Sequence, residues 1–232
     1  MPNRNTMRER PMQRDDTSLF LLSKRIIANL KVFLPFSRID IVWRMVDKSS
    51  DSILDIGCGE GLPIKGVCGH KNFFTVGVDQ SIYFIKKSKA EKIHAEYVLC
   101  NAKFLPFKEK SFDIVLCLEA LYALPKHECM NVINTIQNIA RKQIILSERA
   151  GARSEDIDPW GCHILSTWFA TDFEKMGFKV RGSHGLKLPM LNGVLSKSAG
   201  LKYIFSYLTG LPAYFMPESA QNILCSKKLL RH

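Results

Sequence analysis

The 232-residue chain is long enough for one domain with a modest extension, and its 46% hydrophobic and 24% charged residues exclude natively unfolded and collagen-like proteins. Lys and Arg interrupt every apolar run and no apolar signal segment follows the first residues, so we expect a cytoplasmic protein without a transmembrane helix. The seven cysteines include no Cys-x-x-Cys pair, so we expect reduced thiols and no metal. The net charge of +11 is compatible with nucleic acid, anionic lipid or an acidic substrate, but no dense basic block favours one of these over a solvated surface.

The N-terminal part divides into a tail and two expected helices. Residues 1–17 are polar and Arg-rich and predict a disordered basic tail, which leaves 18–232 as a single domain. Helical patterns within 18–48 comprise Leu19, Leu22, Ile26, Leu30 and Phe33, and then Ile39 to Val46. An amphipathic helix such as the first packs against a core or makes peripheral contact with a membrane surface, and both alternatives stay open.

Strand-like and helix-like segments alternate from residue 49 onward. The expected strands are Ser52–Ile56, Phe73–Asp79, Glu96–Cys100, Phe112–Leu118, Gln143–Ser147, Phe178–Gly182 and Asn222–Ser226. Helices are expected at Glu128–Arg141 and Thr171–Met176. This alternation predicts an α/β fold with a doubly wound, mostly parallel sheet of seven strands. Residues 183–220, between the last two strands, are rich in apolar and aromatic side chains and predict a lid-like insertion.

The strongest motif follows the first expected strand, where Asp55 precedes glycines at three alternate positions, Gly57, Gly59 and Gly61. Glycines permit tight turns and a close approach between backbone and ligand at the carboxyl edge of a parallel sheet. The G-x-G-x-G spacing differs from the G-x-G-x-x-G of dinucleotide-binding folds, and the acids Asp55 and Glu60 would repel a pyrophosphate. The motif therefore disfavours a nicotinamide oxidoreductase and predicts a ligand that is neutral or positively charged near the loop.

Two further polar groups follow the next expected strands. Asp79 ends the second strand, where its carboxylate can accept hydrogen bonds from both hydroxyls of a ribose. Asn101 and Ala102 follow the third strand, where an amide side chain and a backbone N–H can bind the edge of an adenine. Because the carboxyl ends of parallel strands share one edge of a sheet, these residues predict a nucleoside site beside the glycine-rich loop.

In order and spacing these motifs, together with Leu105-Pro106-Phe107 before Phe112-Asp113, resemble the class I S-adenosylmethionine-dependent methyltransferases, in particular their type 11 branch. The resemblance is close over 53–147 and implies a Rossmann-like methyltransferase fold with an antiparallel end, 49–150 as the cofactor-binding core, and S-adenosyl-L-methionine as the cofactor. The implied cofactor-binding residues are Asp55, Gly57, Cys58, Gly59, Gly61, Asp79, Gln80, Asn101, Ala102 and Leu118.

The resemblance also implies a role for several of these residues. The glycines would pass the methionine part of the cofactor, Asp55 would anchor the loop or the amino group, and the Leu118 backbone would lie near the methionine end. Asp79 would hold the ribose hydroxyls, and Asn101 with Ala102 would hold the adenine, although Asn101 stands where the family commonly has aspartate. A helix start is an equally good interpretation of Gln80.

Methyl transfer requires a general base only when the acceptor must lose a proton. The candidates are Glu119 and Tyr122 after the fourth expected strand, Glu148 after the fifth, and His163 in the loop before the next helix. His163 and Trp168 are equally compatible with fastening that loop to the core. Cys68 and His70 resemble half of a metal site, but the sequence offers no second half.

Two motifs that the sequence lacks reduce the range of possible methyl acceptors. The fourth strand is not followed by the Asn/Asp-Pro-Pro-aromatic signature of amino-methylating enzymes, and the chain contains no Pro-Cys dipeptide of the kind that cytosine-C5 enzymes use. We therefore expect a small organic acceptor, and the apolar 183–220 segment suits a hydrophobic one. Nucleic acid is a less favoured partner. The alternatives are an RNA or protein methyltransferase, which the basic charge supports, and a non-catalytic cofactor-binding module.

Overall fold

The computed structural model describes residues 38–69, 71–151, 165–186, 205, 208, 210–217 and 220–229. The predicted tail 1–17, the helical pattern from Leu19, His163 and much of the 183–220 insertion lie outside these residues. No helix in the described ranges is long and apolar enough to cross a membrane.

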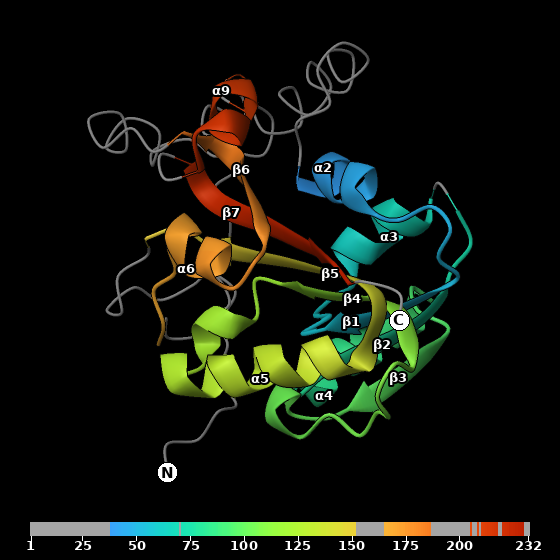
Figure 1. The fold of residues 1–232 in the computed structure, drawn as a ribbon. Helices are drawn as coiled ribbons and strands as arrows, with labels where there is room; N and C mark the ends of the chain where they lie inside the picture. The colour runs from blue at the N-terminus through green and yellow to red at the C-terminus, as the bar shows by residue number, and fades with distance from the viewer. Residues whose placement is uncertain are drawn as a thin grey trace, which may run out of the picture.

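A seven-stranded sheet forms the centre of the fold, with the strand order β3-β2-β1-β4-β5-β7-β6 (Figure 1). Its strands are β1 Ser52–Ile56, β2 Phe74–Asp79, β3 Glu96–Leu99, β4 Phe112–Leu118, β5 Ala140–Arg149, β6 Lys179–Leu186 and β7 Ala220–Lys228. The first five strands are parallel, and β7 is antiparallel to both β5 and β6. The predicted doubly wound, mostly parallel sheet with an antiparallel end is thus confirmed.

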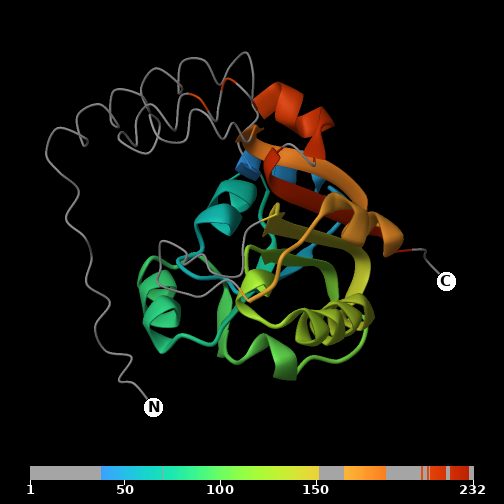
Figure 2. The ribbon, with the colours of Figure 1, turned by 90° about the vertical axis from the view of Figure 1, so that its left-hand side faces the viewer.

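Helices cover both faces of this sheet because the central strands are apolar on both sides. All seven residues of β4 are buried, and alternate residues of the strands belong to two separate clusters. One cluster joins Ile114 and Leu116 to α2 (Arg38–Met45) and α3 (Leu62–Cys68). The other joins Val115 and Cys117 to α5 (Lys126–Ile139) and α6 (Ala170–Lys175). Figure 2 shows α3 and α5 on opposite sides of the sheet.

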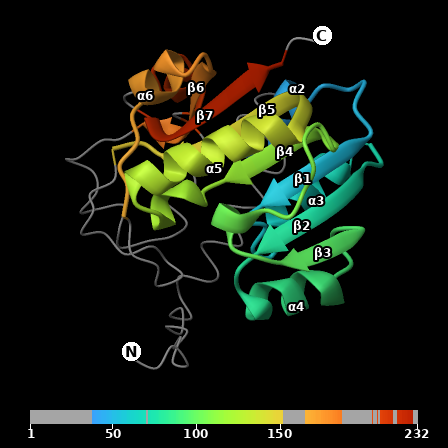
Figure 3. The ribbon, with the colours of Figure 1, turned by 60° about the horizontal axis from the view of Figure 1, so that its bottom comes forward.

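The remaining elements are the connections between strands and one helix near the antiparallel end of the sheet. The helix α4 (Ile82–Ala90) connects β2 to β3, and the short 3-10 turns η1 (Ala102–Phe104) and η2 (Leu121–Ala123) follow β3 and β4. The described part of the 183–220 segment includes α9 (Gly210–Phe215), which packs on β6. The arrowheads of β1 to β4 point to the same edge in Figure 3, so the segments after these strands meet there.

One predicted boundary is wrong in an informative way. The helical pattern Glu128–Arg141 was expected to run through Arg141, but α5 ends at Ile139. Ala140 already belongs to β5 and pairs with Phe112 of β4, so the strand begins directly at the end of the helix. The ladder hydrogen bonds of the central sheet thus override the local helical pattern for the last two residues.

Candidate active site

The glycine-rich loop leaves β1 and folds over the end of β2. Gly57, Gly59 and Gly61 have φ angles of 68°, 52° and 75°, a left-handed region that side chains with a Cβ rarely adopt. The N–H groups of Gly57 and Cys58 both donate to the carbonyl of Val78, at 2.8 and 3.0 Å. The path of the backbone therefore requires the three alternate glycines. The two hydrogen bonds that the loop donates to β2 hold this path in place.

The surroundings of the glycines differ. A Cβ added to Gly57 would lie 2.5 Å from the Cβ of Ala120, whereas a Cβ added to Gly59 would meet nothing within 4 Å. Gly57 is thus packed against the segment that follows β4. The space beside Gly59 is open and can admit a ligand against the backbone.

Asp79 closes the other side of this open space. Its Oδ2 accepts the Gly59 N–H at 3.0 Å, and its Oδ1 accepts the Ser81 N–H at 2.8 Å, directly before α4. Burial raises the pKa of Asp79, and the nearby Asp55 raises it further, while three backbone N–H donors, the third from Gln80, oppose this shift. Among the described residues no cation pairs with Asp79, so a ligand with hydroxyl donors or a positive charge is favoured here.

The residues expected at the adenine lie next to Asp79. The Asn101 Nδ2 donates to the Gln80 Oε1 at 3.0 Å, which links the ends of β3 and β2. The Asn101 Oδ1 accepts the Lys103 N–H at 3.0 Å and so caps η1, whose first residue is Ala102. The buried Leu118 ends β4, on the other side of the loop. The structure therefore brings all the sequence-predicted cofactor residues to one edge of the sheet.

Asp55 has a partner that the sequence analysis missed. Its Oδ2 lies 3.1 Å from the Nε2 of His94, and Asp55 and His94 are only 3% and 5% exposed. His94 stands alone in the segment between α4 and β3, and nothing in its sequence neighbourhood marks it as a partner of β1. Only the tertiary fold identifies this contact.

Two further residues meet where β4, β5 and β7 lie side by side. Glu119 follows β4 with a φ of 57°, an unusual conformation for a glutamate, and its Oε1 accepts a hydrogen bond from the Asn222 Nδ2 at 2.7 Å. Asn222 belongs to β7, more than a hundred positions later in the chain, and was not among the sequence-predicted site residues. Strained backbone of this kind is a frequent feature of functional sites.

Glu148 is buried beneath the same turn. Its Oε1 accepts the N–H groups of Ala120 and Leu121 at 3.3 and 2.9 Å, and its Oε2 accepts that of Tyr122 at 3.1 Å. Burial raises the pKa of Glu148 to about 8, and the neighbouring Glu119 contributes to that rise. With both oxygens engaged by backbone donors, the carboxyl group acts as a clamp on the turn, which favours a structural role over that of a general base.

The loop before α6 is fastened to this turn. The Tyr122 carbonyl accepts the N–H groups of Leu165 and Ser166 at 2.7 and 3.2 Å, and the Arg149 guanidinium lies 5.3 Å from the centre of the Tyr122 ring. The fully buried Trp168 donates from its Nε1 to the Ser166 Oγ at 2.9 Å. Trp168 thus fastens the loop to the core, as one of the two sequence interpretations had it.

The described residues contain no group of three or more His, Cys, Asp or Glu side chains arranged to hold a metal ion. Cys68 is half-buried at the end of α3, and His70 lies outside the described residues.

Comparisons with known proteins agree with this geometry. Residues 53–143 match a family described as a methyltransferase domain. An uncharacterized protein of Methanocaldococcus jannaschii, MJ0638, is 26% identical over 158 residues, which cover 67% of this chain and 68% of that protein. The 24-methylenesterol C-methyltransferase 2 of Arabidopsis thaliana is 31% identical over 87 residues, which cover 35% of this chain but only 24% of that enzyme.

Among solved structures, an S-adenosylmethionine-dependent methyltransferase from Archaeoglobus fulgidus shares the fold, with a TM-score of 0.54 at 14% identity over 89% of this chain and 94% of that one. The matched residues 53–143 contain the glycine-rich loop, Asp79 and Asn101, so the family match and the site concern the same part of the molecule. Residues 53–143 thus match a methyltransferase domain, and the chain shares its fold with solved S-adenosylmethionine-dependent methyltransferases, consistent with the type 11 branch of class I.

Proposed function

We propose that this chain transfers a methyl group from S-adenosylmethionine to a small organic acceptor. The observation that carries the proposal is the open space beside Gly59, bounded by the buried and cation-free carboxylate of Asp79. A phosphate-bearing ligand would be repelled there, whereas a nucleoside with a positively charged sulfur is attracted. The residues present therefore fit the cofactor that the family uses.

Seven of the ten predicted cofactor residues have a defined place in this proposal. Backbone at Gly57, Gly59 and Gly61 approaches the methionine part, and Asp79 accepts from the ribose hydroxyls. Gln80, Asn101 and Ala102 lie at the adenine end. Bound S-adenosylmethionine supplies an activated methyl group, so the protein has chiefly to align the acceptor with it and exclude water.

The acceptor is proposed to lie beyond Glu119, where β4, β5 and β7 end. Glu119 is only half-buried at this edge, whereas Glu148 is fully buried with both oxygens accepting backbone hydrogen bonds, so Glu119 is the better placed of the two carboxylates to receive a proton from an acceptor. The sterol-methylating relative supports a hydrophobic acceptor of modest size. The apolar 183–220 segment, whose described helix α9 packs next to β7 and β6, supports the same class.

Calorimetric titration with S-adenosylhomocysteine tests the cofactor site without knowledge of the acceptor. We expect micromolar binding, no binding of NADH, and a loss of about 1–3 kcal/mol in Asp79→Ala because buried hydroxyls lose their acceptor. Asp51→Ala is the matched control, since the Asp51 side chain is 87% exposed and pairs only with Lys71 among the described residues. Folded protein that binds no sulfur nucleoside would refute the proposal. If S-adenosylhomocysteine binds, assays of methyl transfer to sterol-like, phenolic and amine acceptors would define the substrate.

A further inference from the structure

His94 belongs to a buried set of polar contacts that reaches the strand end from which the glycine-rich loop starts. Its Nε2 lies 3.1 Å from the Oδ2 of Asp55, two residues before Gly57. Counted for the side chains alone, the exposure is 4% for Asp55 and 0% for His94, so both groups are almost fully buried. A carboxylate in such a place requires a donor, and no other hydrogen bond to the Asp55 side chain is found among the described residues.

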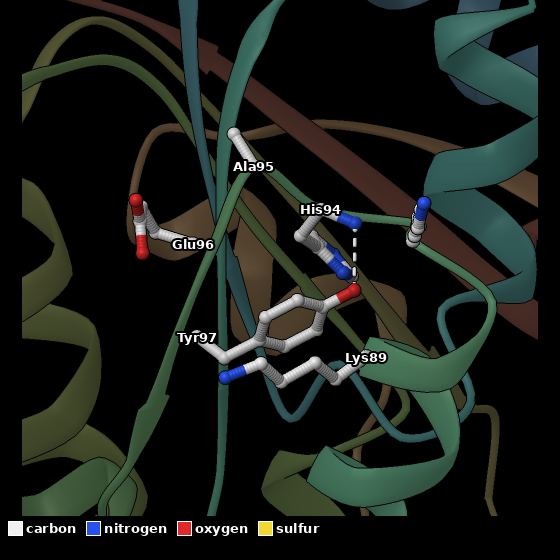
Figure 4. A pocket seen from close by; sticks show the side chains of 6 residues that line it. Lys89, His94, Ala95, Glu96 and Tyr97 are labelled. Atoms are coloured by element: carbon white, nitrogen blue, oxygen red, sulfur yellow. Dashed lines mark hydrogen bonds between the residues drawn. The ribbon is translucent and has the colours of Figure 1, made fainter.

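The imidazole is fixed on its other side by α4 and β3. The His94 backbone N–H donates to the Tyr97 Oη at 2.9 Å (Figure 4). That hydroxyl in turn donates to the Ser88 carbonyl at 2.8 Å. The Ser88 Oγ lies 3.4 Å from the His94 Nδ1, and the Tyr97 ring packs edge-on against the imidazole with centroids 5.3 Å apart. These contacts favour the tautomer in which Nε2 carries the hydrogen and donates to Asp55.

The imidazole also packs against the loop itself. A Cβ added to Gly61 would lie 3.2 Å from the His94 Cε1, and a Cβ added to Gly77 would lie 3.0 Å from its Nδ1 and 3.1 Å from the Cys58 Sγ. The ring therefore fills the space between β2 and the start of α3. A smaller or differently shaped side chain would leave the loop without support from below.

His94 does not face the proposed cofactor edge. A pocket of about 410 Å³ opens beside the segment that contains His94, and its described lining consists of Lys89, Lys92, His94, Ala95, Glu96 and Tyr97 (Figure 4). Neither the glycine-rich loop nor Asp79 contributes to that lining. Any effect of His94 on a ligand at the glycine-rich loop must therefore pass through Asp55 and the loop.

We infer that His94 is a positioning residue for cofactor binding, which holds Asp55 by a hydrogen bond and thereby sets the conformation of the Gly57–Gly61 loop. This inference rests on the proposed cofactor site. His94 touches neither the cofactor nor the acceptor, so its replacement changes cofactor affinity, while the chemistry of the transfer step is left to other groups.

Three substitutions separate donation to Asp55 from simple filling of space. In His94→Gln the amide nitrogen can reach the position of Nε2, in His94→Asn it is too short to do so, and in His94→Leu the side chain has no donor. We expect S-adenosylhomocysteine affinity within about threefold of the wild type for Gln, and a loss of about tenfold or more for Asn and Leu. Ile133→Val, in α5 on the opposite face of the sheet, controls for a small loss of core packing and should bind normally.

The measurement is calorimetric titration of each full-length variant at a temperature where its circular dichroism shows it folded. Weak binding by the Asn variant together with near-normal binding by the Gln variant supports the inference, and this pair decides the matter if the Leu variant does not fold. Normal affinity in His94→Asn, or equal losses in Asn and Gln variants, would overturn it. Wild-type protein that binds no S-adenosylhomocysteine would overturn the proposed function and this inference with it, a result that the comparison between variants cannot mimic.

Discussion

Gly57 and Gly59 provide a matched pair of substitutions, because their backbones are alike and their surroundings are not. Their φ angles are 68° and 52°, so alanine at either position carries about 1–2 kcal/mol of backbone strain. The new Cβ would lie 2.5 Å from the Cβ of Ala120 in Gly57→Ala, but would meet nothing within 4 Å in Gly59→Ala. The difference in stability between the two variants therefore isolates the packing of Gly57.

The size of this difference follows from what holds Ala120. The Ala120 side chain is a single methyl group, the Cβ itself, so no change of rotamer can move it away. The Ala120 and Leu121 N–H groups donate to the buried Glu148, so the main chain of the turn also resists displacement. Forcing an extra carbon into such a place costs about 1–3 kcal/mol. The free energy of unfolding of Gly57→Ala is thus expected to be lower than that of Gly59→Ala by this amount. The melting temperature should differ by roughly 2–4 °C for each kcal/mol.

Urea unfolding and S-adenosylhomocysteine titration on the same two variants provide the assay. Gly59→Ala should lose more than tenfold in affinity although it is the more stable variant, because its methyl group enters the space proposed for the cofactor. Equal stability of the two variants would refute the packing argument. Unchanged affinity in Gly59→Ala would refute the position of the cofactor beside this residue.

Three other substitutions test the buried polar groups. Burial alone would raise the pKa of Asp113, but the Asp51 N–H and two neighbouring cations hold this pKa below its usual value. Because these groups stabilise the charged carboxylate, Asp113→Asn should lower the free energy of unfolding at pH 7 by about 1–2 kcal/mol. Urea titrations should show that difference shrinking as the pH falls below 4, where the wild type loses the charged form. Burial raises the pKa of Glu148 to about 8, so the wild type should lose on the order of 4 kcal/mol as the pH rises from 5 to above 8, and Glu148→Gln should lack this slope. Trp168→Phe removes the bond to Ser166 and leaves a small cavity, so thermal unfolding should show a loss of about 1–3 kcal/mol with unchanged S-adenosylhomocysteine affinity.

The sheet was predictable because its strands are buried on both faces. A run such as Phe112–Leu118 is apolar at nearly every position, and the glycines after Ile56 mark the end of the preceding strand without ambiguity. The parallel order of the first five strands followed from the alternation with helices. The end of α5 was not predictable, because whether Ala140 continues a helix or starts β5 depends on a ladder partner that is distant in sequence.

The site was predictable only in part, for a related reason. A carboxylate after a strand can point toward a ligand or back into the protein, and the sequence around Glu119 and Glu148 does not distinguish the two cases. The structure shows Glu148 clamping the next turn and Glu119 bonded to Asn222. His94 and Asn222 carry no local signal at all, since each acquires its partner only when segments far apart in the chain come together.

The position of β7 has a consequence for how the chain is made. This strand follows every other described strand in the sequence, yet it pairs between β5 and β6. Until residues 220–228 leave the ribosome, the edge of β5 that includes the buried Ile144, Ile145 and Leu146 lacks its neighbour. An exposed apolar strand edge is a template for pairing with other chains. A nascent or truncated chain without β7 is therefore expected to aggregate or to require a chaperone, even though every residue of the proposed cofactor site has already been synthesised.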